Sequence, residues 1–204
     1  MPRRALLIDA VAFARARRDW LAERLAETRP QPLPLSDGEQ LVVFGVPWRL
    51  QPDGRRPRLA PDLGEGERRL LGCGQDRVDA QLVSRVVRRE AADVFRARAE
   101  IHCAALGVPT PPVLLTDTRS RWGSCAPPRP GRSATIRLSW RLALAPFDVA
   151  DYVVAHECAH LREANHGPRF WALVRALVGS ETAHRAWLRA EGQTLHAILP
   201  RAGA

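Results

Sequence analysis

Three absences in the sequence narrow the classes of protein to which it can belong. Its 204 residues include no lysine, so the net charge of +9 comes from 31 arginines set against 22 acidic residues. No apolar run approaches the roughly 20 residues that a membrane-spanning helix needs, and the four cysteines lack the paired C-x-x-C spacing of zinc ribbons and redox motifs. We therefore expect a soluble, cytoplasmic protein with reduced thiols and no membrane partner.

The excess of arginine has two interpretations. A composition rich in alanine and proline but without lysine is typical of a GC-rich coding bias, in which case the arginines simply form a solvated surface. Alternatively, the basic surface could associate weakly with nucleic acid. The charge alone does not decide between these interpretations.

The spacing of apolar residues predicts helices and strands in the first half of the chain. Apolar residues recur at helical intervals over 6–25, and the stretch 41–59, with Asp53-Gly54 as its turn, predicts a small β-hairpin. A second helical pattern over 76–106 ends at Gly107, a typical signal for the C-terminus of a helix.

The second half of the chain is predicted to add more strands and helices. Strands are expected at 113–116, 121–125 and 134–140, and helices are expected to open near residues 146, 167 and 181. The expected fold class is therefore α+β, with one small antiparallel sheet packed against helices. We expect residues 1–75 to form an N-terminal region with the first helix and the hairpin, and residues 76–204 to form a second domain.

The segment from His156 to His160 has the pattern H-E-x-x-H. Residues four apart on a helix lie on one face, with Cβ atoms about 5–6 Å apart, so the imidazoles of His156 and His160 can bind one Zn²⁺. Both histidines share the apolar phase of the predicted helix with Val149 and Tyr152. Glu157 would lie beside a zinc-bound water and could take its proton as a general base.

A third histidine follows at a spacing that could complete the site. His166 comes after five further residues, and Asn165 tolerates the left-handed conformation that could turn the chain back towards the metal. Gly167-Pro168 then opens the next helix. Three nitrogen ligands leave a fourth position for water, as in catalytic rather than structural zinc sites.

The spacing H-E-x-x-H-x5-H also occurs in metzincins. Metzincins place a glycine between the second and third ligands, where this chain has Glu163, and they need a methionine turn beneath the metal. The only methionine of the chain is Met1. The metzincin interpretation therefore fails on two counts.

Five segments together carry a family pattern: Arg121-Trp122-Gly123-Ser124-Cys125, Ile136 to Leu142, Asp151 to Val154, His156 to Leu161, and Asn165 to Trp171. They resemble the YgjP-like metallopeptidase family, which is grouped near the SprT-like and M48-type gluzincin peptidases. The resemblance implies a zincin-like fold and a zinc-dependent metallopeptidase that hydrolyses peptide or protein substrates. It also implies that His156, His160 and His166 hold the zinc and that Glu157 is the general base.

Two alternatives stay open beside this resemblance. Gluzincins often take their third ligand from a glutamate on a later helix, and Glu181 and Glu191 are available for that role. A SprT-like protease acting near DNA, or a DNA-binding protein, would instead use the basic surface for recruitment.

The surroundings of the predicted site carry weaker expectations. The strand 136–140 could offer an edge to an extended peptide. Trp122 and Trp140 are expected to pack rather than to line the cleft, and Tyr152 could either support His156 or pack in the core.

Overall fold

The computed structural model describes residues 35–60, 66, 68–72, 74 and 77–200, all of which belong to one compact unit, residues 32–204. The helix predicted over 6–25 lies outside the described residues. Within the described part of the chain, no helix is both long enough and apolar enough to cross a membrane.

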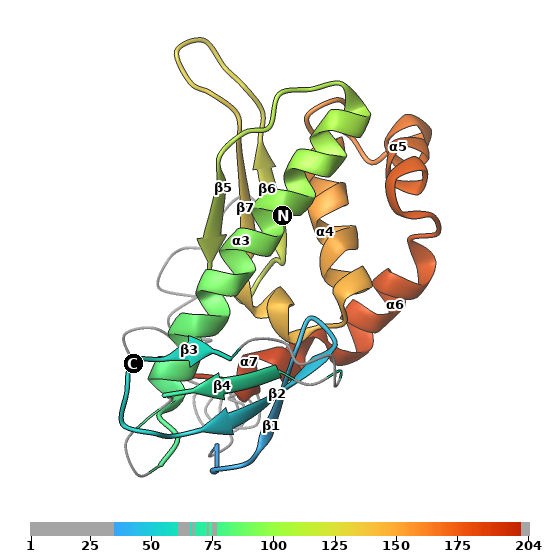
Figure 1. Cartoon of the computed structure of the whole chain (residues 1–204). Coiled ribbons are helices and arrows are strands. Elements are labelled where there is room, and N and C mark those ends of the chain that lie inside the picture. The colour runs from blue at the N-terminus through green and yellow to red at the C-terminus, as the bar shows by residue number, and fades with distance from the viewer. Residues whose placement is uncertain (1–34, 61–65, 67, 73, 75–76, 201–204) are drawn as a thin grey trace, which may run out of the picture. The chain divides into compact units, whose positions relative to one another are not determined.

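The described residues form two small sheets and several helices (Figure 1). The strands are β1 (Gln40–Val43), β2 (Val46–Gln51), β3 (Arg58–Leu59), β4 (Arg68–Leu71), β5 (Val113–Thr116), β6 (Gly123–Ala126) and β7 (Thr135–Ser139). The helices are α3 (Ala80–Leu106), α4 (Phe147–Ala159), α5 (Pro168–Val178), α6 (Thr182–Glu191) and α7 (Leu195–Ile198), with short 3₁₀ helices η1 (Trp140–Leu144) and η2 (Gly192–Thr194).

Both sheets are mixed. The first has the strand order β1-β2-β4-β3, with a parallel β2–β4 pair between two antiparallel pairs. The second has the order β5-β7-β6, in which β7 pairs parallel with β5 and antiparallel with β6. The α+β class is confirmed, but the expectation of a single antiparallel sheet is wrong.

The hairpin forms at a different turn from the predicted one. β1 and β2 pair directly, so the loop between them is the two residues Phe44-Gly45, whose φ angles are 51° and 79°. Positive φ at both central residues matches the right-handed twist of two paired strands, and Phe44 is held there because its N–H donates to the carbonyl of Ala143 at 2.6 Å. Asp53-Gly54 instead follows β2, and β3 pairs with β4.

Helix α3 is the longest element, and its ends follow from its sequence. The side chain of Asp79 accepts hydrogen bonds from the N–H groups of Gln81 and Leu82 and so caps the first turn. Gly107 closes the helix in the left-handed conformation, with φ of 65°. The predicted long helix is therefore confirmed, with its start at Ala80.

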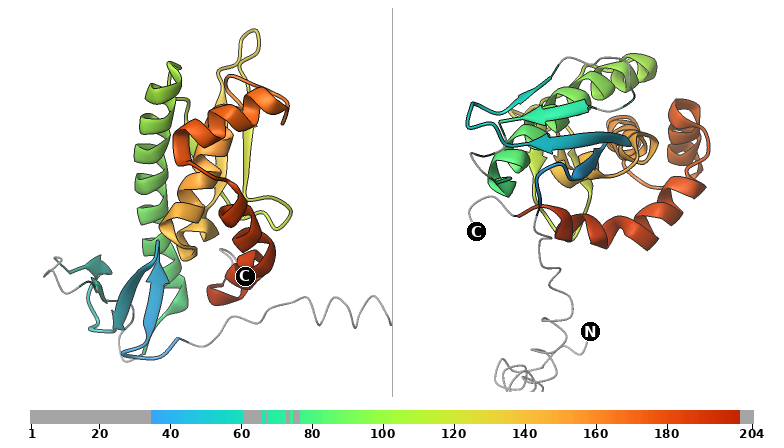
Figure 2. Two further views of the ribbon diagram at one scale, coloured as in Figure 1. Left: turned by 90° about the vertical axis from the view of Figure 1, so that its right-hand side faces the viewer. Right: turned by 60° about the horizontal axis from the view of Figure 1, so that its bottom comes forward.

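Helices α3 and α4 lie side by side, and the β5-β7-β6 sheet packs against them (Figures 1 and 2). Asp151 on α4 joins the two helices: its carboxylate accepts two hydrogen bonds from Arg98, at 2.7 and 2.8 Å, and contacts Nε2 of the buried His102 at 2.7 Å. Burial acts to raise the pKa of Asp151, but these hydrogen bonds outweigh it and lower the pKa below its usual value.

A buried arginine holds helix α7 against this core. Arg141 in η1 is fully buried and makes a bidentate ion pair with Asp117, at 2.6 and 3.2 Å. It also donates to the carbonyls of Leu195 and Leu199, so helix α7 is held against η1.

One hydrophobic core runs through the described residues. It joins Leu41 and Trp48 of the first sheet to Phe95 of α3, Leu138 of β7 and Val154 of α4. The boundary between residues 75 and 76 stays a prediction, although the core continues across it.

Candidate metal centre

Helix α4 places His156 and His160 on one face. The helix ends at Ala159, but His160 keeps helical angles (φ −65°, ψ −15°), so the four-residue spacing still brings the two rings together. Their centroids lie 5.0 Å apart, nearly perpendicular at 80°. Both side chains are partly buried, as the apolar phase of the helix predicts.

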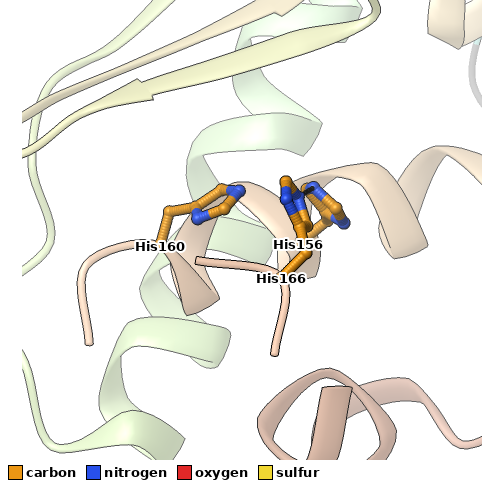
Figure 3. A group of neighbouring side chains, drawn as sticks. All are labelled: His156, His160 and His166. Atoms are coloured by element: carbon orange, nitrogen blue, oxygen red, sulfur yellow. Dashed lines mark hydrogen bonds between the residues drawn. The ribbon is translucent and has the colours of Figure 1, made fainter. Parts of the chain in front are cut away.

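A tight turn returns His166 to the same place (Figure 3). The N–H of Gly167 donates to the carbonyl of Asn165 at 2.7 Å, so His166 is the central residue of a three-residue turn. The expected left-handed Asn165 is wrong: outside glycine, Phe44 is the only described residue with positive φ. Gly167 then caps α5, with Pro168 in its first turn.

The three imidazoles converge. Each offers one nitrogen, and these three atoms lie within 4.8 Å of one another. Nε2 of His156 and Nε2 of His166 are 3.0 Å apart, whereas a tetrahedral zinc ion 2.0–2.1 Å from each would separate them by about 3.3 Å. A shift of a few tenths of an ångström would therefore fit the pair to a metal.

The protonation of these histidines also suits a metal. Burial, together with the neighbouring His160, His166 and Arg185, lowers the pKa of His156 to about 3, and burial lowers the pKa of His160. Both rings are therefore neutral at pH 7, so no proton has to leave before a metal binds. Nδ1 of His160 lies 3.1 Å from the carbonyl of Glu163. Because a carbonyl can only accept, the ring hydrogen of His160 is on Nδ1, and Nε2 keeps a lone pair for a metal.

Glu157 lies beside the histidines and is buried, with only 6% of its surface exposed. Burial raises the pKa of its carboxyl to about 7, against the opposing effects of Arg121 and of the N–H of Cys125, which donates to the carboxylate. A polar group so deeply buried needs such a partner. Glu157 is thus held in one place at the edge of β6.

Gly123 makes room for that carboxylate. A Cβ atom at position 123 would lie 2.5 Å from Oε1 of Glu157, 2.7 Å from its Cγ and 2.8 Å from its Cδ. Real Cβ atoms essentially never come so close, so any other residue would displace Glu157. Gly123 is therefore needed for the close approach of strand β6 to helix α4.

These groups share an open cleft of about 370 Å³, which we call the histidine cleft. It is lined by Gly123, Ser124, Cys125, Pro127, His156, Glu157, His160, Ala164 and His166. Among the described residues no carboxylate joins the three histidines, and Glu181 pairs instead with Arg175 at 3.2 Å.

Comparison with models of known protein families shows to which family the chain belongs. The family model described as YgjP-like, metallopeptidase domain, matches residues 1–191. The chain belongs to the YgjP-like metallopeptidase family. No curated protein and no solved structure gives a significant match. Membership of the YgjP-like family makes the chain a hydrolase of the metallopeptidase class, and the histidine cleft lies within the matched residues.

An aromatic floor supports the three histidines of this YgjP-like domain. Phe170 on α5 is fully buried, and its ring centroid lies 4.5–4.8 Å from those of all three histidines. Trp171 lies 5.9 Å from His156 and 5.8 Å from His166. In the sequence Phe170 is only part of the family segment Asn165 to Trp171, so its contact with every histidine comes from the structure.

The other aromatic residues pack as expected. Trp140 is fully buried, and Trp122 stacks on His196 with ring centroids 5.3 Å apart. Tyr152 is 5% exposed, contacts His156 edge-on at 5.9 Å and stacks on His184 at 5.5 Å. It therefore packs beside a histidine of the cleft without donating to it.

The strand edge beside the site belongs to β6 and not to β7. The sequence suggested an edge at 136–140, but β7 is the central strand of its sheet. The N–H of Ser139 donates to the carbonyl of Trp122, so these residues form a hydrogen-bonded pair and every second residue of β6 also bonds inwards. The main-chain N–H and carbonyl groups of Gly123 and Cys125 therefore point away from β7, towards the side on which Glu157 lies.

Proposed function

We propose that the chain is a zinc-dependent peptidase in which His156, His160 and His166 hold the metal and Glu157 is the general base. One observation carries the proposal: three imidazole nitrogens converge within 4.8 Å in the cleft that also contains a buried carboxylate. Three nitrogen ligands with an open position are typical of catalytic zinc.

The metal and the carboxylate have separate tasks in this mechanism. When bound, zinc supplies Lewis acidity, which polarises the scissile carbonyl and lowers the pKa of water. Glu157 takes the proton of the attacking water and passes it to the leaving amine. The N–H of Cys125 orients the carboxylate, and Gly123 lets strand β6 approach it.

The substrate is an extended peptide that pairs with strand β6. An edge strand can bind a peptide through main-chain hydrogen bonds, and β6 is at the edge of its sheet. The N–H of Cys125 is taken by Glu157, but the outward-facing main-chain groups of Gly123 and the carbonyl of Cys125 line the histidine cleft, so a peptide paired with them would place a carbonyl group beside Glu157.

The substitution Glu157→Gln tests the proposal because it keeps the shape of the side chain and removes the base. Zinc content and Tm should hardly change, while kcat/KM for peptide hydrolysis falls by at least about 10², as is typical for loss of a general base. Glu163→Gln is the matched control, because this side chain does not line the cleft, and it should stay within a few-fold of wild type. Wild-type activity in Glu157→Gln would refute the assignment.

Weak nucleic-acid association through the arginine-rich surface stays a prediction. No observation on the described residues favours it over peptide hydrolysis. A DNA affinity that falls steeply with salt concentration would support it.

A further inference from the structure

A second cleft, of about 450 Å³, adjoins the histidine cleft. We call it the proline cleft because four prolines, Pro109, Pro111, Pro112 and Pro128, form much of its wall. Val108, Ala134 and Leu161 complete its apolar surface. It lies between the C-terminal ends of α3 and α4 and the base of the β6–β7 loop.

The two clefts are neighbours along two segments of chain. Pro127 lines the histidine cleft, and the next residue, Pro128, lines the proline cleft. In the same way, His160 lines the histidine cleft and Leu161 lines the proline cleft. Consecutive Cα atoms are 3.8 Å apart, so no residue separates the two clefts on either segment. The two clefts therefore meet at these two segments of chain.

The walls of the proline cleft are held in place by main-chain hydrogen bonds. The N–H of Val108 donates to the carbonyl of Cys103 at 3.0 Å, the N–H of Ile136 to Pro112 at 3.0 Å, and the N–H of Leu161 to Cys158 at 3.0 Å. Proline fixes its own φ angle and has no N–H to donate. The cleft is therefore preformed and offers few hydrogen-bond donors.

The chemistry of the lining selects the ligand. Among the described residues that line it, none is ionisable, and the polar side chains are the hydroxyls of Thr110 and Ser133. A charged group placed there would lose its hydration without gaining a partner, whereas an apolar side chain would be removed from water. The cleft is thus suited to a large aliphatic or aromatic side chain.

We propose that the proline cleft is the specificity pocket of the peptidase and binds an apolar side chain of the peptide substrate. This inference rests on the proposed function, because it places the scissile bond in the histidine cleft. A strand rises 3.2–3.4 Å per residue, and side chains on one face recur every second residue. We therefore expect the selected side chain to lie within two residues of the scissile bond.

Cleavage of a peptide library, read by mass spectrometry, tests the inference in the zinc-loaded protein. Wild type should favour large apolar over basic residues at one position within two residues of the cleaved bond, by at least about tenfold. Ser133→Glu adds a carboxylate to the proline cleft and should reverse that ratio towards arginine and lysine. Ser36→Glu, an exposed serine outside both clefts, makes the same charge change and should leave the ratio unaltered.

A second readout does not depend on turnover. A peptide with one photoreactive phenylalanine analogue, irradiated with Glu157→Gln, should crosslink to residues 108–112 or to Leu161. Cleavage that depends on Glu157 but shows no apolar preference, with crosslinks elsewhere, would overturn the specificity pocket and leave the peptidase intact. Crosslinks in the proline cleft without wild-type cleavage would refute the peptidase and support apolar side-chain binding. If neither cleavage nor crosslinks in the proline cleft were observed, both proposals would be refuted.

Discussion

Adding one methyl group at Gly123 should misplace Glu157. The new Cβ would lie 2.5 Å from Oε1, whereas ordinary contacts begin at 3.4 Å, so the carboxylate has to retreat by about 3.4 − 2.5 = 0.9 Å. A misplacement of about 1 Å at a reacting group can cost about 10² in rate. We therefore expect Gly123→Ala to lower kcat/KM by about 10².

Zinc content should distinguish this effect from damage to the metal site. The three atoms nearest to the added methyl group all belong to Glu157, so Gly123→Ala should bind as much zinc as wild type. Gly167→Ala is the matched control: its φ is −80° and a Cβ there meets no atom within 4 Å, so activity should be retained. A fully active Gly123→Ala would refute the placement of Glu157 as the base.

Further outcomes follow from the histidines and from Asp151. His166→Ala should weaken zinc binding at least about tenfold, whereas Glu181→Ala and Glu191→Ala should not. Competition with a chromophoric chelator ranks the three variants. If only a glutamate variant lost zinc, that glutamate and not His166 would be the third ligand. Because the pKa of Asp151 is lowered in the folded state, its ionised carboxylate stabilises the fold at pH values above the unfolded-state pKa, near 3.8. This contribution is lost as the pH falls through the folded-state pKa. Asp151→Asn should therefore destabilise the protein at pH 7 by roughly 1–3 kcal/mol and show a smaller loss of stability below about pH 4 in urea titrations; an unchanged pH profile would contradict this.

The histidines of the site were predictable because their geometry is local. Residues four apart on a helix face the same way whatever surrounds them, so the pairing of His156 with His160 follows from the sequence. The same holds for the end of α3 at Gly107, whereas its start was predicted at residue 76 and is set at Ala80 by the cap of Asp79. The route of the turn to His166 was not predictable, because it depends on the hydrogen bond from the N–H of Gly167 to the carbonyl of Asn165 and not on a left-handed conformation of Asn165.

The sheets were harder to predict because their pairings are not local. Asp53-Gly54 has the sequence of a hairpin turn, yet β4, which comes later in the chain, takes the place beside β2. Likewise β7 inserts between β5 and β6, which turns the expected edge strand into a central one. The role of Gly123 depends on that arrangement, since only the packing of β6 against α4 shows what a side chain there would meet.

The metal content of the purified protein tests the central claim most directly. Protein prepared without chelator should contain about one zinc per chain by elemental analysis, because three converging imidazoles form a preorganised nitrogen site. A His156→Ala, His160→Ala double variant that remains folded should lose that zinc. Stoichiometric zinc that persists in the double variant would place the metal elsewhere and contradict the account.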